Sequence, residues 1–256
     1  MVNPARKRPA VLPGATLSEF DGVRYLHLGT PWVQGAMRVR APKKLELEYI
    51  QRMMVWLLFR PLDGLTEAHA VQLGLGAAAI TRFTHQVLGM RTTALEINES
   101  VILACRLWFA LPEDSPRLSV LLGDAGRWIA RDAAVGSIDA LCVDMYDNEA
   151  AAPVLDDVGF YAACRAALTE GGLMTVNLFG RDAVFSRSTG RIAEAFGSDQ
   201  VWQMSPTKEG NTIVIAGRGV VVPDRATLER RAESVQAKFG LPATKWLRMV
   251  QPLPLR

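Results

Sequence analysis

An apolar run leads into two closely spaced glycines at Val71-Gln72-Leu73-Gly74-Leu75-Gly76-Ala77-Ala78-Ala79-Ile80-Thr81. This pattern predicts a buried strand that turns sharply into a helix. Glycines at 74 and 76 permit a tight turn and a close approach to a ligand, and the start of the helix offers free amide donors. The stretch is interpreted as a cradle for a nucleotide or nucleoside. A structural turn without a ligand is the alternative, since Ala79 stands in the third place of the G-x-G-x-x-G/A fingerprint.

Carboxylates at the ends of the next three expected strands favour the ligand interpretation. Glu96 lies about 20 residues after Gly76, where a carboxylate can accept both hydrogen bonds of a ribose diol. Asp124 follows the strand at 118–122, and Asp144 follows the one at 140–143. In open α/β sheets, ligands bind at the carboxyl ends of the strands. The competing roles are helix capping for Glu96 and Asp124, and a plain loop acid for Asp144.

Alternating strand and helix patterns predict an α/β fold with a mainly parallel sheet covered on both faces. Strands are expected at about 69–74, 92–97, 118–122, 139–145 and 173–179, and helices at 78–88, 99–108, 126–133, 159–168 and 187–196. Gly171-Gly172 is a candidate C-cap of the fourth helix. The segments 200–204 and 212–216 are too close for a helical crossover and predict an antiparallel pair, so we expect seven strands with an antiparallel last one.

The segments outside this pattern predict four regions. Residues 1–16 are expected to form a flexible tail, and residues 17–64 a small N-terminal appendage made of a β-hairpin and an amphipathic helix at 45–59. Residues 65–219 are expected to form the Rossmann-like, nucleoside-binding catalytic domain. Residues 220–256 comprise a C-terminal helix from Pro223-Asp224 to Phe239 and a trailing tail.

Composition excludes several classes of protein. The chain has 256 residues, is 49% hydrophobic and carries a net charge of +3, which predicts a large core and little affinity for nucleic acid. No apolar run approaches the ~18 residues of a membrane span, and no apolar signal core follows the N-terminus. The three cysteines and three histidines lack the spacing of metal ligands. These observations predict a cytoplasmic protein without a metal, nucleic acid or membrane partner.

The chain resembles the spermidine synthase (polyamine aminopropyltransferase) family, which has the Rossmann-like class I S-adenosylmethionine-dependent methyltransferase fold. The resemblance is carried by the segments 73–76, 94–97, 123–125, 144–147 and 160–168 followed by Gly171-Gly172. It implies that Gly74 and Gly76 approach the methionine-derived part of the nucleoside and that Glu96 holds the ribose. It further implies that Asp124 receives the adenine amino group, with Ala125 beside it.

The resemblance also implies the reaction. Asp144 matches the catalytic aspartate of the family, Asp147 completes its Asp-x-x-Asp pair, and Gln34 corresponds to a hairpin glutamine near the substrate. The expected activity is transfer of an aminopropyl group from decarboxylated S-adenosylmethionine, as co-substrate, to a diamine such as putrescine. Methylthioadenosine is released, and no prosthetic group is needed. Asp147 or Glu149 is a candidate to hold the distal ammonium of the diamine.

Departures from the family pattern leave two other functions open. Gln51 stands where the family has the glutamate of a Tyr-His-Glu cluster, and Lys208 replaces a tyrosine. These changes are compatible with a non-catalytic S-adenosyl-nucleoside-binding protein. The third candidate is a methyltransferase that uses intact S-adenosylmethionine, with Arg82 or Lys208 as the partner of the methionine carboxylate. We also expect a homodimer, because the hairpin and the apolar stripe of 45–59 exceed what one domain needs to cover.

Overall fold

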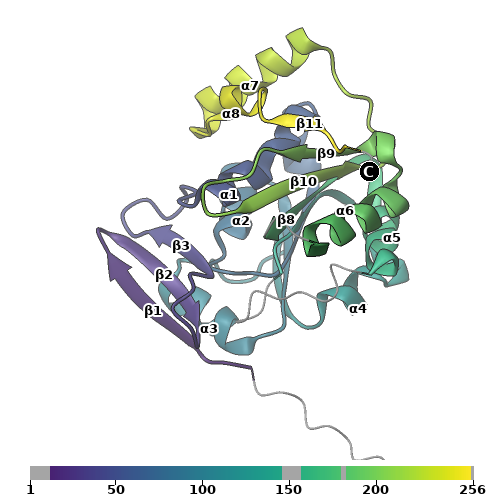
Figure 1. The fold of residues 1–256 in the computed structure, drawn as a ribbon. Helices are drawn as coiled ribbons and strands as arrows, with labels where there is room; N and C mark the ends of the chain where they lie inside the picture. Colours follow the sequence, from purple (N-terminus) through teal and green to yellow (C-terminus); the bar gives the residue numbers. More distant parts are fainter. Residues whose placement is uncertain (1–11, 146–156, 180–182, 255–256) are drawn as a thin grey trace, which may run out of the picture.

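The computed structural model describes residues 12–145, 157–179 and 183–254, and its centre is an eight-stranded sheet in the order β11-β9-β10-β8-β7-β4-β5-β6 (Figure 1). The strands are β4 (His69–Leu73), β5 (Arg91–Glu96), β6 (Leu118–Leu122), β7 (Ile138–Val143), β8 (Leu168–Phe179), β9 (Val201–Met204), β10 (Asn211–Gly217) and β11 (Val250–Pro252). From β8 to β6 the strands are parallel, whereas β10, β9 and β11 pair antiparallel. The predicted α/β fold and its antiparallel pair are confirmed.

Helices cover both faces of this sheet, as predicted. They are α2 (Ala79–Arg82) with the π-helical turn η3 (Phe83–Val87), α3 (Glu99–Trp108), α4 (Ala125–Ile129), η4 (Asp132–Ala134), α5 (Val158–Ala167) and α6 (Ala183–Phe196). Alternate residues of one strand enter different cores: Ala140 packs in one cluster, and Leu141 packs in another with residues of α5 and α6. This alternation follows from the period of two in a β-strand.

The N-terminal appendage is a three-stranded antiparallel sheet of β1 (Ala15–Phe20), β2 (Val23–Leu28) and β3 (Gly35–Arg38). The predicted hairpin is confirmed as β2 and β3, but β1 begins inside the expected tail of 1–16. This sheet sits directly on the glycine loop after β4. A Cβ atom on Gly35 would lie 2.5 Å from the backbone nitrogen of Ala77, so only glycine permits this contact.

The expected amphipathic helix at 45–59 is wrong in its detail. The segment forms α1 (Glu48–Arg52) and the 3₁₀ helix η1 (Met53–Leu58), and a further 3₁₀ turn, η2, spans Leu65–Glu67. Every residue of η1 is buried, because β8, α7 and α8 pack around it. The apolar stripe is therefore covered by its own chain and does not supply a surface for a dimer.

The C-terminal region is more ordered than predicted. Helix α7 (Arg225–Phe239) begins at the N-cap Asp224, which accepts a hydrogen bond from the Thr227 amide, and α8 (Ala243–Trp246) buries Trp246. Strand β11 then pairs with β9. The expected tail at 240–256 is thus wrong, and the sheet has eight strands instead of seven because its edge strand β9 gains a partner from the end of the chain.

The expected C-cap at Gly171-Gly172 is also wrong. Helix α5 ends at Ala167, and Leu168 already has extended backbone angles. Both glycines lie within β8, which starts at Leu168 and is longer than predicted because it pairs with β7 and β10. The short 3₁₀ helix η6 (Ser198–Gln200) then connects α6 to β9.

Candidate active site

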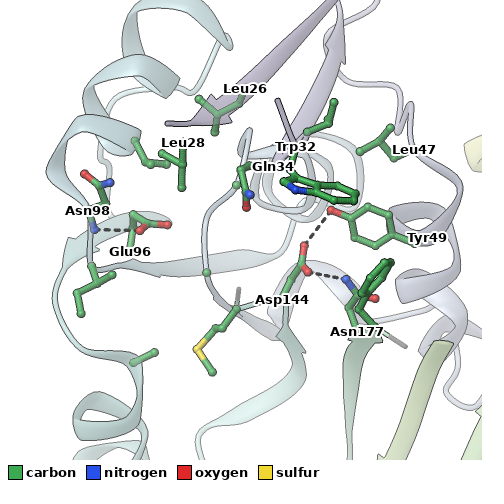
Figure 2. Close-up of a pocket in the computed structure, with 18 of the residues that line it drawn as sticks. Leu26, Leu28, Trp32, Gln34, Leu47, Tyr49, Glu96, Asn98, Asp144 and Asn177 are labelled. Carbon is green, nitrogen blue, oxygen red and sulfur yellow. Dashed lines mark hydrogen bonds between the residues drawn. The ribbon is translucent and has the colours of Figure 1, made fainter. Parts of the chain in front are cut away.

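The carboxyl ends of the central strands open into a cavity of about 970 Å³, which the N-terminal sheet and α1 border on the other side (Figure 2). Its lining includes the predicted residues Gln34, Gly74, Gly76, Glu96, Asp124, Ala125 and Asp144. Asp147 and Glu149 lie outside the described residues. Residues far apart in the sequence are thus brought to one edge of the sheet, where open α/β folds bind ligands.

Gly74 determines the backbone conformation of the glycine loop. Its φ of +86° lies in the left-handed region, and a Cβ atom at this position would be 2.0 Å from the backbone oxygen of Asp144. Its amide donates to the Leu95 oxygen at 2.9 Å, while the Asp144 amide donates to the Leu73 oxygen at 2.9 Å. The loop is therefore pressed against the end of β7 that carries Asp144.

Glu96 links the glycine loop to the end of β5. One carboxylate oxygen accepts a hydrogen bond from the Leu75 amide at 3.0 Å, and the other accepts one from the Asn98 amide at 2.9 Å. Burial raises the pKa of Glu96, and these backbone donors oppose that shift. The N-cap of α3 is Asn98, whose side chain accepts from Ser100, so Glu96 is not the cap. A carboxylate has about four acceptor positions, so these backbone donors leave Glu96 able to accept from a ligand hydroxyl.

Asp124 caps a helix, which is the competing role that the sequence left open for it. Its Oδ1 accepts a hydrogen bond from the Arg127 amide at 2.8 Å and starts α4. This bond uses one of its two oxygens. Ala125 and Gly126 follow on the cavity wall, so the cap also fixes the backbone that faces the ligand space.

Asp144 lies between two side chains that sequence reasoning did not assign to the site. The Tyr49 hydroxyl, from α1, donates to Oδ2 at 3.3 Å, and the Asn177 amide, from β8, donates to Oδ1 at 2.9 Å (Figure 2). Burial raises the pKa of Asp144 to about 6, although both hydrogen bonds act to lower it. Asn177 has a signal in the sequence, since it is a lone amide in the apolar run Met174–Leu178.

The charge of the cavity is one-sided. Its described lining contains no lysine, arginine or histidine but six carboxylates, namely Glu46, Glu48, Glu96, Asp124, Asp144 and Glu209. Glu46 and Glu48 are paired with Arg38 and Arg52, respectively. The cavity therefore suits a cationic ligand.

Arg82 does not belong to this cavity, so its proposed role with a methionine carboxylate is wrong. Its side chain is buried and donates to the backbone oxygens of Pro42, Ala77 and Phe109. Burial lowers the pKa of Arg82 to about 10. Lys208 is exposed and is not among the described lining residues.

Solved structures identify the class of protein that this fold defines. A probable spermidine synthase from Corynebacterium glutamicum superposes with a TM-score of 0.73, at 18% identity, over 92% of this chain and 90% of that one. Human methyltransferase-like protein 13, in complex with SAH, gives 0.67 at 18% identity over 82% and 96%. The chain thus has the class I S-adenosylmethionine-dependent methyltransferase fold.

Curated relatives identify the family within this class. The chain is 31% identical over 240 residues to the polyamine aminopropyltransferase of Neisseria meningitidis serogroup B, covering 92% of this chain and 89% of the relative. The enzyme of the same name from Chromobacterium violaceum is 30% identical over the same shares. No protein-family model matches the chain. The protein belongs to the polyamine aminopropyltransferase family.

The helices bear on whether the chain could span a membrane. Across the described ranges, every helix is too short or too polar to cross a bilayer.

Proposed function

We propose that the protein transfers an aminopropyl group from decarboxylated S-adenosylmethionine to a diamine such as putrescine and releases methylthioadenosine. The observation that carries this proposal is Asp144, which lies in an otherwise acidic cavity at the strand ends beside the glycine loop and the Glu96 carboxylate. Its raised pKa of about 6 leaves it ionised at neutral pH yet able to accept a proton.

Charge favours the decarboxylated nucleoside over intact S-adenosylmethionine. The decarboxylated donor carries only positive groups, a sulfonium and an ammonium, and these match the four lining carboxylates that are not paired with an arginine. Intact S-adenosylmethionine adds a carboxylate that would face these groups without a cationic partner among the described lining residues. Because an unpaired charge is costly to remove from water, the methyltransferase alternative is disfavoured.

The expected reaction is a displacement at carbon. The amine nitrogen attacks the propyl carbon attached to the sulfonium, the C–S bond breaks, and its electron pair neutralises sulfur in the leaving thioether. The amine is protonated in water, with a pKa of about 10, and must lose a proton to attack. Asp144 accepts this proton, and Tyr49 and Asn177 hold its two oxygens in place. Positioning of the two substrates supplies on the order of 7–11 kcal/mol in favourable cases.

The departures at Gln51 and Lys208 leave this cavity acidic. Gln51 donates to the Leu45 backbone oxygen at 2.8 Å and, like Lys208, is absent from the described lining. Glu209 lies in that lining, on the turn that leads into β10. We therefore assign the distal ammonium of the diamine to Glu209, alongside the candidates Asp147 and Glu149.

The test is an incubation with decarboxylated S-adenosylmethionine and a panel of diamines, with methylthioadenosine as the readout. Wild-type protein should release it only when an amine is present. Asp144→Asn should abolish release while calorimetry still detects methylthioadenosine binding, and the exposed Asp199→Asn should behave like wild type. Unchanged turnover in Asp144→Asn would remove this residue from the mechanism. Nucleoside binding without turnover for any amine would support the non-catalytic alternative.

We also propose a homodimer that uses the N-terminal sheet. Phe20 on β1 is 77% exposed, and Leu107 on the neighbouring α3 is 71% exposed. Exposed apolar side chains on adjacent elements commonly mark an interface. Light scattering should give twice the chain mass at micromolar concentration, and Phe20→Lys should shift it towards the monomer. A monomer in the wild type would contradict this proposal.

A further inference from the structure

A chain of side-chain hydrogen bonds continues beyond Asp144 to the start of β10. The Asn211 side-chain amide donates to Asn177 Oδ1 at 3.0 Å, and the Asn177 amide donates to Asp144 Oδ1 at 2.9 Å. In the antiparallel pair of β8 and β10, Asn211 faces Phe179 and Asn177 faces Ile213. The two asparagines are thus diagonal neighbours on one face of the sheet, within reach of each other's side chains.

The turn before β10 holds Asn211 in place. Its backbone nitrogen donates to Thr207 Oγ1 at 3.2 Å, and its backbone oxygen accepts from the Thr207 amide at 2.8 Å. Asn211 and Asn177 both border the cavity, and Asn177 is 3% exposed. The two asparagines therefore form a hydrogen-bonded part of the cavity lining.

The direction of these bonds has a chemical consequence. An asparagine amide presents donors at its nitrogen and acceptors at its oxygen, and rotation by half a turn exchanges the two. An ionised carboxylate needs a donor opposite it, whereas a protonated carboxyl group can donate to an oxygen. Because Asn211 offers an N–H to Asn177 Oδ1, the Asn177 nitrogen is turned towards Asp144.

We propose that Asn211 is a positioning residue that, by fixing the orientation of the Asn177 amide, keeps Asp144 in the ionised form that accepts the proton of the attacking amine. This inference rests on the proposed aminopropyl transfer. The Asn211 side chain donates to Asn177, which in turn contacts Asp144, so Asn211 acts through its neighbour.

The other titratable groups around Asp144 do not replace this contact. Tyr49 from α1 holds the second oxygen, and Cys142 on β7 is a buried thiol whose pKa is raised to about 12. The remaining carboxylates of the described lining carry charge of the same sign and do not favour an ionised Asp144. They are Glu46, Glu48, Glu96, Asp124 and Glu209. Among the described residues, the neutral hydrogen bonds from Tyr49 and Asn177 are thus what favours the charged form.

The test compares two variants with a matched control. Asn211→Ala removes the donor to Asn177. Asn211→Asp offers only acceptors when ionised, so the Asn177 nitrogen turns towards residue 211 and the Asn177 oxygen turns towards Asp144. Gln203→Ala, on the adjacent strand β9 and outside the described cavity lining, is the control. Loss of the Asn211 donor lets the Asn177 amide turn, which weakens its hydrogen bond to the Asp144 carboxylate by about one pKa unit. The acid limb of the kcat/KM profile should therefore move up by about one pH unit in Asn211→Ala, with about tenfold loss on that limb and near-wild-type values above about pH 8.

The second readout does not need turnover. The Asp144 carboxyl, labelled with carbon-13 and assigned with Asp144→Asn, is titrated by NMR in the unliganded protein. Its midpoint should rise in Asn211→Ala, rise further in Asn211→Asp, and stay unchanged in Gln203→Ala. A shifted midpoint without any turnover would reject the proposed reaction but keep the positioning role. An unchanged midpoint in folded Asn211 variants, or loss of the fold in both, would overturn the inference.

Discussion

Replacing Gly74 by alanine would place a methyl group against the backbone that carries Asp144. The new Cβ would lie 2.0 Å from the Asp144 oxygen, whereas ordinary contact begins near 3.4 Å, so the end of β7 must retreat by roughly 1.4 Å. A displacement of this size at a catalytic group lowers the rate by about 100-fold, or about 2.7 kcal/mol. The φ of +86° adds about 1–2 kcal/mol of backbone strain.

A second glycine separates the two effects. Gly64 has a similar φ of +79°, but a Cβ atom added there would have no heavy atom within 4 Å. Gly64→Ala should therefore show the strain in urea unfolding but keep its activity. Gly74→Ala should lower the free energy of unfolding by at least the same amount and lower kcat/KM for methylthioadenosine release about 100-fold. If both variants had equal kcat/KM, the contact between the loop and Asp144 would have no catalytic importance.

Three further substitutions test other parts of the site. The pKa of Asp144 is about 6 in the folded protein and exceeds the ordinary aspartate value of 3.8. The ionised group therefore destabilises the folded state, fully above pH 6 and not at all below about pH 4. Asp144→Asn should thus raise the free energy of unfolding by up to about 3 kcal/mol at about pH 7 and leave it unchanged at about pH 4, whereas equal effects at both values would contradict the raised pKa. Glu209→Gln should raise the KM for putrescine about tenfold without altering methylthioadenosine affinity, because only the cationic acceptor loses a charged partner; an unchanged KM would remove Glu209 from the acceptor site. Arg82→Met should lower the free energy of unfolding in urea by about 3 kcal/mol, because three backbone oxygens lose their donor, and a neutral result would show that water replaces it.

The elements with strong local signals were predictable from the sequence. Helix α3 was predicted at its observed bounds, because Asn98 caps it and its apolar residues follow a helical period. Strands β4 to β7 were predicted to within two residues, since parallel strands buried on both faces form apolar runs between polar turns. Gly74, Glu96 and Asp144 were selected by their positions at the carboxyl ends of these strands.

The features that were missed depend on contacts between distant segments. Nothing local in Val250–Pro252 indicates a strand, and β11 exists because it pairs with the edge of β9. The Gly171-Gly172 pair favours a turn locally, yet pairing with β7 and β10 keeps it in β8. Asn177 and Tyr49 could not be assigned to Asp144 because their bonds to it span 33 and 95 residues of sequence.

The contact between Gly35 and Ala77 joins the two halves of the site thermodynamically. Gly35, on the hairpin that precedes Tyr49, packs closely against Ala77 of the glycine loop, which lies on the side of the cavity that we propose for the nucleoside. A nucleoside that immobilises the loop therefore also restricts the hairpin. The hairpin then loses less conformational entropy when the amine binds. We expect positive cooperativity between substrates that need not touch: putrescine should bind more tightly when methylthioadenosine is present. Equal putrescine affinity with and without the nucleoside, measured by calorimetry, would show that the two halves order independently.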